Sequence, residues 1–267
     1  MIDAKKIWQD VQAIRKKAPL VHNITNYVVM NTTANALLCI GASPVMAHAL
    51  EEVEEMVGMA AALGGALVIN IGTLSQKWIE SMAVAMRAAQ KRSVPIVFDP
   101  VGAGATTLRT QVCHQLLGEV SPTILRGNAS EIMALLDATV QTRGVDSSRA
   151  SSRAKEAAAT AATLYRCVVC VSGEEDIITD GKTVRTVRNG HAMMSRVTGL
   201  GCTATALIGA FAAVNAHPLD AAAHGMAVMG IAGEIAAAKA QGPGTLQLHF
   251  YDALYRLSAQ DIEKRLR

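Results

Sequence analysis

The sequence predicts an α/β fold with a mostly parallel central sheet, helices on both faces and an antiparallel hairpin at one edge. Short, almost continuously apolar runs alternate with longer segments of helical character, which is typical of strands joined by crossover helices. Glycines, of which the chain has 21, separate many of these segments. One late pair of short runs is joined by the turn dipeptide Asp180-Gly181, which indicates a hairpin.

The alternation of helix and strand starts at the N-terminus. Residues 1–17 mix charged and apolar side chains at helical spacing, with Ile7, Val11 and Ile14 on one stripe. Gly41 ends the next helix, and the helix after that has acidic residues in its first turn, where the helix dipole favours them. In order, we expect a strand at 19–24, a helix at 28–40, a strand at 43–47 and a helix at 51–63.

The middle of the chain contains the most apolar strands. Residues 66–71 and 94–98 are near-continuous apolar runs, of the kind found in sheets that are covered on both faces. Gly72-Thr73 closes the first run, and Asp99-Pro100 closes the second before a glycine-rich loop at 101–106. The other segments expected here are helices at 75–91, 108–117 and 128–136 and a strand at 123–125.

The last third of the chain completes the sheet and then becomes helical. A polar, Ser-rich stretch at 144–153 predicts a surface loop. With no linker, charge block or repeat in the sequence, residues 1–267 are predicted to form a single domain, in which 1–18 is an N-terminal helix. The segments expected are a helix at 154–165, strands at 167–171, 176–179 and 183–187, and helices at 206–214, 219–238 and 253–265, with a break at 242–244.

Composition excludes several classes of protein. A net charge of +3 without a dense Lys/Arg run argues against a nucleic-acid partner. The sequence has no uncharged apolar run of ~18 residues and no secretory leader pattern, so we expect no membrane association and a cytoplasmic location. The five cysteines are scattered and odd in number, which favours reduced thiols. Cys167 and Cys170 match C-x-x-C, but residues three apart on a strand point to opposite faces, so we expect no redox pair.

The stretch from Thr198 to Ala206 has the composition of an anion site. Gly199 and Gly201 flank one residue and precede an apolar helix. Glycine permits positive φ and a close approach to main-chain N–H groups, and the positive end of the helix dipole would point at the same place. Such helix starts bind phosphate. The alternative is a tight strand-to-helix turn that binds nothing.

Polar residues at the ends of predicted strands should converge on the same edge of the sheet. In open α/β sheets, ligands bind beyond the carboxyl ends of the strands. Together with the glycine loop, these residues predict a cleft for a phosphorylated ligand. They are Asn26, Thr73, Asp99, Arg126, Asn128, Ser172 and the 199–202 loop.

Four of these positions have a functional and a structural interpretation. Asp99 could hold Mg²⁺, which prefers carboxylate, water and phosphate oxygens, or it could cap a turn. Asn128 and Glu131 have the spacing of a capping pair, and Glu131 could also orient metal-bound water or phosphate. Arg126 could clamp a phosphate or lie on the surface. Cys202, at a helix start, could be a reactive thiolate or simply a small residue in a crowded loop.

A set of short motifs carries a family resemblance: 19–26 (PLVHNITN), 41–46 (GASPVM), 70–74 (NIGTL), 99–106 (DPVGAGAT), 126–132 (RGNASEI), 144–147 (GVDS) and 199–202 (GLGC). Together they resemble the hydroxyethylthiazole kinases of thiamine salvage, which have the ribokinase-like fold, from about residue 19 to about residue 255. Two positions depart from the family pattern. Ser172 stands where Thr is frequent, and it keeps the hydroxyl. Tyr27 stands where a smaller or acidic residue is common.

The resemblance implies ATP-dependent phosphorylation of the hydroxyl of 4-methyl-5-(2-hydroxyethyl)thiazole, with Mg²⁺, in a homotrimer whose sites lie between subunits. It also implies which residues form the site. These are Met46, Gly199, Asn26, Gly72 and Thr73 for the thiazole; Arg126, Ser172 and Asn128 for ATP; Asp99 and Glu131 for the metal and phosphates; and Cys202, Gly199 and Gly201 for the chemistry.

In most ribokinase-like enzymes an Asp ends the glycine loop and acts as the base, whereas here that position is Cys202. We therefore expect the N–H groups of the loop to contribute more than the base. Two alternatives stay open from the sequence: a kinase for another small alcohol, such as hydroxymethylpyrimidine, and a nucleotide-binding protein without turnover. A nicotinamide-dependent oxidoreductase is disfavoured, because the glycine loop lies near residue 200 and not after the first strand.

Overall fold

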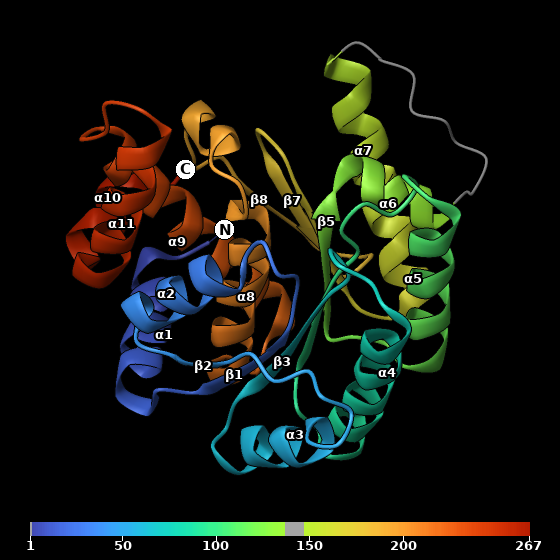
Figure 1. Cartoon of the computed structure of the whole chain (residues 1–267). Helices are drawn as coiled ribbons and strands as arrows, with labels where there is room; N and C mark the ends of the chain where they lie inside the picture. The colour runs from blue at the N-terminus through green and yellow to red at the C-terminus, as the bar shows by residue number, and fades with distance from the viewer. Residues whose placement is uncertain (1, 137–146) are drawn as a thin grey trace.

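A computed structural model of the chain describes residues 2–136 and 147–267 (Figure 1). Eight strands form one sheet in the order β2-β1-β3-β4-β5-β6-β7-β8. Neighbouring strands are parallel from β2 to β6, and β7 and β8 add an antiparallel edge. The predicted fold class is confirmed. The strands are β1 (Leu20–Ile24), β2 (Ser43–Val45), β3 (Ala66–Asn70), β4 (Ile96–Asp99), β5 (Ile124–Asn128), β6 (Val168–Ser172), β7 (Asp176–Thr179) and β8 (Val184–Val187).

Helices cover both faces of the sheet, and each face has its own apolar core (Figure 1). Val169 in β6 belongs to the second of these cores, and its neighbour Cys170 belongs to the first. One face carries α1 (Ala4–Lys17), α2 (Met30–Ile40), α8 (Leu200–Val214), α9 (Pro218–Ala237), α10 (Pro243–Arg256) and α11 (Ala259–Arg265); the other carries α3 (Val53–Ala62), α4 (Gln76–Lys91), α5 (Thr107–Glu119), α6 (Ala129–Leu136) and α7 (Ser147–Tyr165).

The two cysteines of the C-x-x-C match lie on opposite sides of the sheet, as expected. Cys167, just before β6, belongs to the same core as α7, and Cys170 belongs to the core of α8 and α9. Both are buried free thiols. Burial raises the pKa of the Cys167 thiol to about 12, which removes thiolate reactivity at neutral pH.

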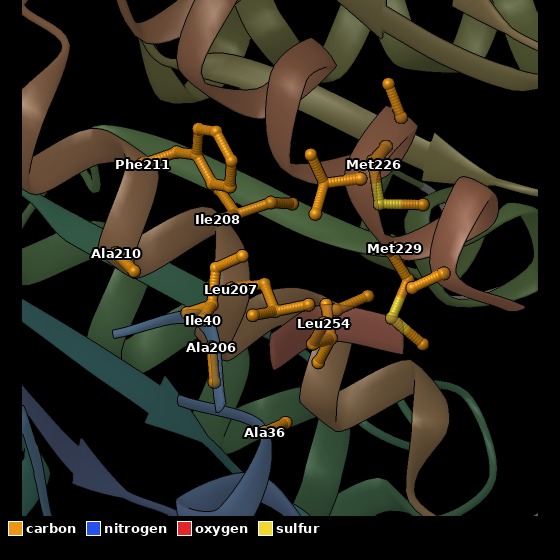
Figure 2. Close-up of a cluster of buried hydrophobic side chains, with 14 of the residues drawn as sticks. Ala36, Ile40, Ala206, Leu207, Ile208, Ala210, Phe211, Met226, Met229 and Leu254 are labelled. Atoms are coloured by element: carbon orange, nitrogen blue, oxygen red, sulfur yellow. The ribbon is translucent and has the colours of Figure 1, made fainter. Parts of the chain in front are cut away.

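Helix α8 is surrounded by apolar side chains, and this fixes where its N-terminus lies. Figure 2 shows side chains of α2, α9 and α10 gathered around those of α8, among which are Leu207 and Phe211. Both are fully buried, as are most residues from Thr203 onward. A helix that is apolar on all sides lies inside its protein. The first turn of α8 is therefore held rigidly at the edge of the sheet.

The N-terminal helix forms where the sequence predicted it. Ile7, Val11 and Ile14 are completely buried on one face of α1. Asp3 caps the start of the helix through a hydrogen bond from the N–H of Lys5. Within the described ranges, no helix combines the length and the apolar character that crossing a bilayer would require.

Some helix boundaries were predicted wrongly. Helix α7 already begins at Ser147, inside the stretch that the sequence suggested was a loop, because Ser, Arg and Ala all tolerate a helix and no Gly or Pro interrupts them. Residues 144–146 of the GVDS motif lie outside the described residues. The expected helix at 253–265 is two helices: α10 starts at Pro243, and a capping box of Ser258 and Asp261 starts α11.

Candidate active site

The carboxyl ends of the parallel strands gather the predicted polar residues at the same edge of the sheet. Asn70, Asp99, Asn128 and Ser172 are the last residues of β3, β4, β5 and β6. Residue 70 is in register with 99, and residue 128 with 172. Arg126 lies within β5 and not after it, because this strand runs three residues beyond its predicted end.

The glycine loop is the first turn of α8. The helix begins at Leu200, earlier than the predicted Ala206, and Gly199 is its N-cap with φ 84°. A Cβ on Gly199 would also lie 2.8 Å from Cγ1 of Val29, so both the backbone and the neighbour require glycine. The N–H groups of the first turn have no acceptor inside a helix, and they start at this loop. The structure thus provides the helix start on which an anion site depends.

Gly201 allows Arg126 to approach this helix start. A Cβ on Gly201 would lie 3.2 Å from Nη1 of Arg126, which is tighter than most real contacts. Arg126 is buried, so the surface interpretation of this arginine is wrong. Its Nη2 donates to Oγ of Ser172 at 2.8 Å, and its Nη1 lies 3.9 Å from Oδ2 of Asp99. Burial opposes the charge of Arg126, but the nearby acidic groups, Asp99 first among them, together outweigh burial and raise the pKa of the guanidinium.

Asp99 is held through one oxygen only. Its Oδ2 accepts hydrogen bonds from Oγ1 of Thr205 at 2.6 Å and from Nδ2 of Asn70 at 3.1 Å. Its Oδ1 is buried and has no hydrogen-bond partner among the described residues. Burial raises the pKa of Asp99 to about 6, although Arg126, Thr205 and Asn70 all favour its ionised form. The arrangement leaves one oriented carboxylate oxygen at the edge of the sheet.

Asn128 and Glu131 form the predicted capping pair. Oδ1 of Asn128 accepts from the N–H of Glu131 at 2.9 Å, and Oε2 of Glu131 accepts from the N–H of Asn128 at 2.8 Å. Oε1 of Glu131 also accepts from the N–H of Gly102 at 2.9 Å, which ties the loop after β4 to the start of α6. Both oxygens of Glu131 therefore have structural partners. A metal role for Glu131 stays a prediction.

Cys202 is not the thiolate that its place at a helix start suggested. Burial, followed by the nearby charge of Asp99, raises the pKa of its thiol to about 11. Hydrogen bonds donated to the thiol lower its pKa, and one of them comes from Nδ2 of Asn26, 3.6 Å from Sγ. Desolvation and the charge of Asp99 together outweigh these hydrogen bonds and the charge of Arg126. At neutral pH the thiol keeps its proton.

The loops after β1, β2 and β3, at the same edge of the sheet, carry the residues predicted for the thiazole, which are Asn26, Met46, Gly72 and Thr73. A Cβ on Gly72 would meet Nδ2 of Asn26 at 2.6 Å, so glycine is required for this contact. Met46 and Thr73 follow β2 and β3 and are half-buried. Neither makes a hydrogen bond to Asn26 or Gly72 in the described part of the chain. Their substrate contacts stay predictions.

Two members of the polar network were missed from the sequence. Asn70 was treated as part of an apolar strand, yet it is the last residue of β3 and bonds to Asn26, Gly72 and Asp99. A polar residue closing an apolar strand was the available signal. Thr205 lay in the stretch from Thr198 to Ala206 without a role of its own, and only the direction of α8 brings its hydroxyl to Asp99.

The residues at this edge are compatible with Mg²⁺ bound together with phosphate. No group of three or more His, Cys, Asp or Glu side chains that could hold a metal occurs among the described residues. Mg²⁺ does not need one, since it is usually bound through one or two carboxylates, phosphate oxygens and waters. The unpartnered Oδ1 of Asp99 is a carboxylate oxygen of the kind that could serve as such a ligand.

A hollow of about 400 Å³ lies at the opposite edge of the sheet. It is lined by residues before or at the start of β4 and β5, such as Pro95 and Thr123, and by Asn215 at the end of α8. None of its lining residues carries a charge. The polar network, and not this hollow, is therefore the candidate active site.

Solved structures of kinases share the fold of this chain. The pyridoxal kinase from Staphylococcus aureus, solved in complex with AMP-PCP and pyridoxal, matches with a TM-score of 0.59 and 17% identity over 80% of this chain and 87% of that one. At this identity the likeness shows the fold alone.

The particular family follows from closer relatives. The model of the hydroxyethylthiazole kinase family matches residues 11–260. The hydroxyethylthiazole kinase of Syntrophus aciditrophicus is 60% identical over 267 residues, covering 100% of this chain and 97% of that protein. That of Oleidesulfovibrio alaskensis is 59% identical over 257 residues, covering 96% and 95%. The solved protein of this family from Pyrococcus horikoshii matches with a TM-score of 0.90 and 45% identity over 98% of both chains. The chain belongs to the hydroxyethylthiazole kinase family and is an enzyme, a kinase.

Proposed function

We propose that this kinase transfers the terminal phosphoryl group of ATP to the hydroxyl of 4-methyl-5-(2-hydroxyethyl)thiazole, a step of thiamine salvage. The observation that carries the proposal is the contact between Arg126 and Gly201, where a buried guanidinium meets the first turn of α8. A fixed positive charge beside free backbone N–H groups suits a transferring phosphoryl group.

Phosphoryl transfer is mainly positioning and charge stabilisation, because its transition state is loose. In this proposal the N–H groups from Gly199 to Cys202 hold the equatorial oxygens of the phosphoryl group, and Arg126 adds a charged donor. Ser172 keeps Arg126 in place through its 2.8 Å hydrogen bond. Since these donors are fixed by the fold, they need no reorganisation when charge redistributes.

Asp99 would hold Mg²⁺ through Oδ1, with Glu131 and Asn128 ordering the loop beside it. When bound, the ion would neutralise phosphate charge. The protein prepares for it by engaging Oδ2 of Asp99 with Asn70 and Thr205, which leaves Oδ1 for the ligand.

The acceptor hydroxyl would lie between Cys202 and the loops that carry Asn26, Met46, Gly72 and Thr73. A thiol with a pKa of about 11 cannot remove a proton efficiently at neutral pH. We therefore assign Cys202 to contact the hydroxyl and orient it. The alcohol would lose its proton late, as a loose transition state allows, to an oxygen of the transferred phosphoryl group. We also propose that the protein is a cytoplasmic homotrimer with sites at the subunit boundaries. Light scattering of the purified protein tests the trimer.

A coupled ADP-release assay tests the function. The purified chain is given ATP, with and without Mg²⁺, and each of three alcohols: the hydroxyethylthiazole, hydroxymethylpyrimidine and pyridoxal. We expect Mg²⁺-dependent ADP release with the thiazole and at least tenfold lower kcat/KM with the other two. A preference for another alcohol would replace the proposed substrate. Nucleotide binding without turnover on any of them would refute the proposed reaction.

A further inference from the structure

The side-chain amide of Asn70 joins the two halves of the polar network. It lies at the carboxyl end of β3 and is 1% exposed. Its Oδ1 accepts from the N–H of Gly72 at 3.0 Å and from Nδ2 of Asn26 at 2.9 Å. Its Nδ2 donates to Oδ2 of Asp99 at 3.1 Å. One residue thus contacts the proposed acceptor side and the proposed phosphate side.

The directions of these hydrogen bonds are fixed by backbone groups that can only donate. The N–H of Gly72 requires an oxygen, so Oδ1 of Asn70 faces it and Nδ2 faces the carboxylate. The N–H of Val28 donates to Oδ1 of Asn26 at 3.1 Å, which leaves Nδ2 of Asn26 to donate to Asn70 and to Sγ of Cys202. All of these hydrogen bonds therefore have a fixed donor and a fixed acceptor. Only a side-chain amide at position 70 can both accept from the N–H of Gly72 and donate to the carboxylate of Asp99.

We propose that Asn70 is a positioning residue for phosphoryl transfer. It sets the distance and direction between Asn26 and Cys202 on one side and Asp99 on the other. The proposal rests on the proposed function for the identity of the two sides. It assigns a role that neither the glycine loop nor the family resemblance gave to this residue. A displacement of about 1 Å between reacting groups costs about 10²-fold in rate, so a loss of this spacing affects turnover more than nucleotide binding.

Two substitutions test this role. Asn70→Asp is isosteric, but it removes the donor to Asp99 and sets two carboxylates against each other. Asn70→Ala removes all three hydrogen bonds of the side chain without adding charge. Asn35→Asp is the matched control, because Asn35 donates to Asn31 in an exposed pair on α2. We expect Asn70→Asp to lower kcat about 100-fold and Asn70→Ala at least tenfold, with the KM for ATP within threefold of the wild type and no change in the control.

A second measurement does not depend on turnover. The alkylation rate of Cys202 by iodoacetamide, followed by peptide mass spectrometry, should fall at least threefold in Asn70→Ala, because Asn26 is no longer held to donate to the thiol and less of the reactive thiolate forms. The rate at Cys39 should not change. If the wild type does not phosphorylate the thiazole, the proposed function fails and this measurement alone decides the role of Asn70. Folded variants with kcat and Cys202 alkylation within twofold of the wild type would overturn the inference, as would loss of folding in both variants.

Discussion

Oγ1 of Thr205 donates a 2.6 Å hydrogen bond to Oδ2 of Asp99, and both side chains are buried. The bond connects the second turn of α8 to the end of β4, so the helix start and the carboxylate are held in one rigid arrangement. Because Asn70 bonds to the same oxygen, the other oxygen of Asp99 points away from these structural partners. A displacement of α8 would therefore change the anion site and the carboxylate together.

Thr205→Val removes this hydrogen bond at nearly constant volume. A buried carboxylate that loses a donor should destabilise the protein by about 1–3 kcal/mol, and kcat should fall because Asp99 is less well oriented. Thr203→Val is the control, since Thr203 lies on the same helix and its buried hydroxyl has no partner among the described residues. We expect Thr203→Val to leave stability unchanged or to raise it. Equal effects of the two substitutions in urea unfolding would contradict this account.

Gly199→Ala tests the helix start. The substitution should cost about 1–2 kcal/mol for the left-handed backbone, in addition to the contact with Val29, and it should lower kcat/KM by displacing the first N–H groups of α8. Adding Val29→Ala removes the contact but not the backbone strain. Only part of the stability should therefore return, as measured by urea unfolding. Full recovery in the double variant would show that the steric contact, and not the φ angle, requires glycine.

The sequence predicted the layers, the antiparallel hairpin at one edge and the gathering of strand-end polar residues at the same edge of the sheet, because apolar strands and their closing residues are local signals. It did not predict the state of Cys202. That depends first on burial and then on Asp99, which is 103 positions away in the sequence but close enough to raise the thiol pKa. Nor did it predict Thr205, whose hydroxyl reaches Asp99 only through the packing of α8. Charge coupling and helix orientation are tertiary effects, and a single sequence does not show them.

The raised thiol pKa changes what substitutions at Cys202 should do. A positioned base typically contributes ~10²–10⁴-fold, and a protonated thiol should contribute at or below the lower end of that range. We expect Cys202→Ala to lower kcat by no more than about 100-fold with ATP binding retained, and Cys202→Asp to stay active. Steady-state kinetics with the thiazole checks both. A folded Cys202→Asp that binds both substrates but does not turn over would refute the idea that an acidic residue can replace the thiol.

Asp176, at the start of β7, should make stability depend on pH. It is 5% exposed, and burial raises the pKa of its carboxyl to about 6, against the favourable effects of the Gly173 N–H and of Arg126. Between pH 4 and 6 the folded protein thus binds more protons than the unfolded chain, so stability falls as pH rises through this window. Above pH 6, the raised pKa of Asp176 corresponds to a free energy of unfolding that is about 3 kcal/mol lower than with a protonated Asp176.

Asp176→Asn should remove this loss, because an amide keeps an oxygen for the N–H of Gly173 but never ionises. We expect the variant to be more stable than the wild type by up to about 3 kcal/mol at pH 8, and by only about 1 kcal/mol at pH 4.5. Urea unfolding at the two pH values measures the difference, and Asp180→Asn, at an exposed turn position with a lowered carboxyl pKa, is the control. A constant difference between pH 4.5 and 8 would mean that Asp176 stays ionised throughout, and that Arg126 compensates its burial fully.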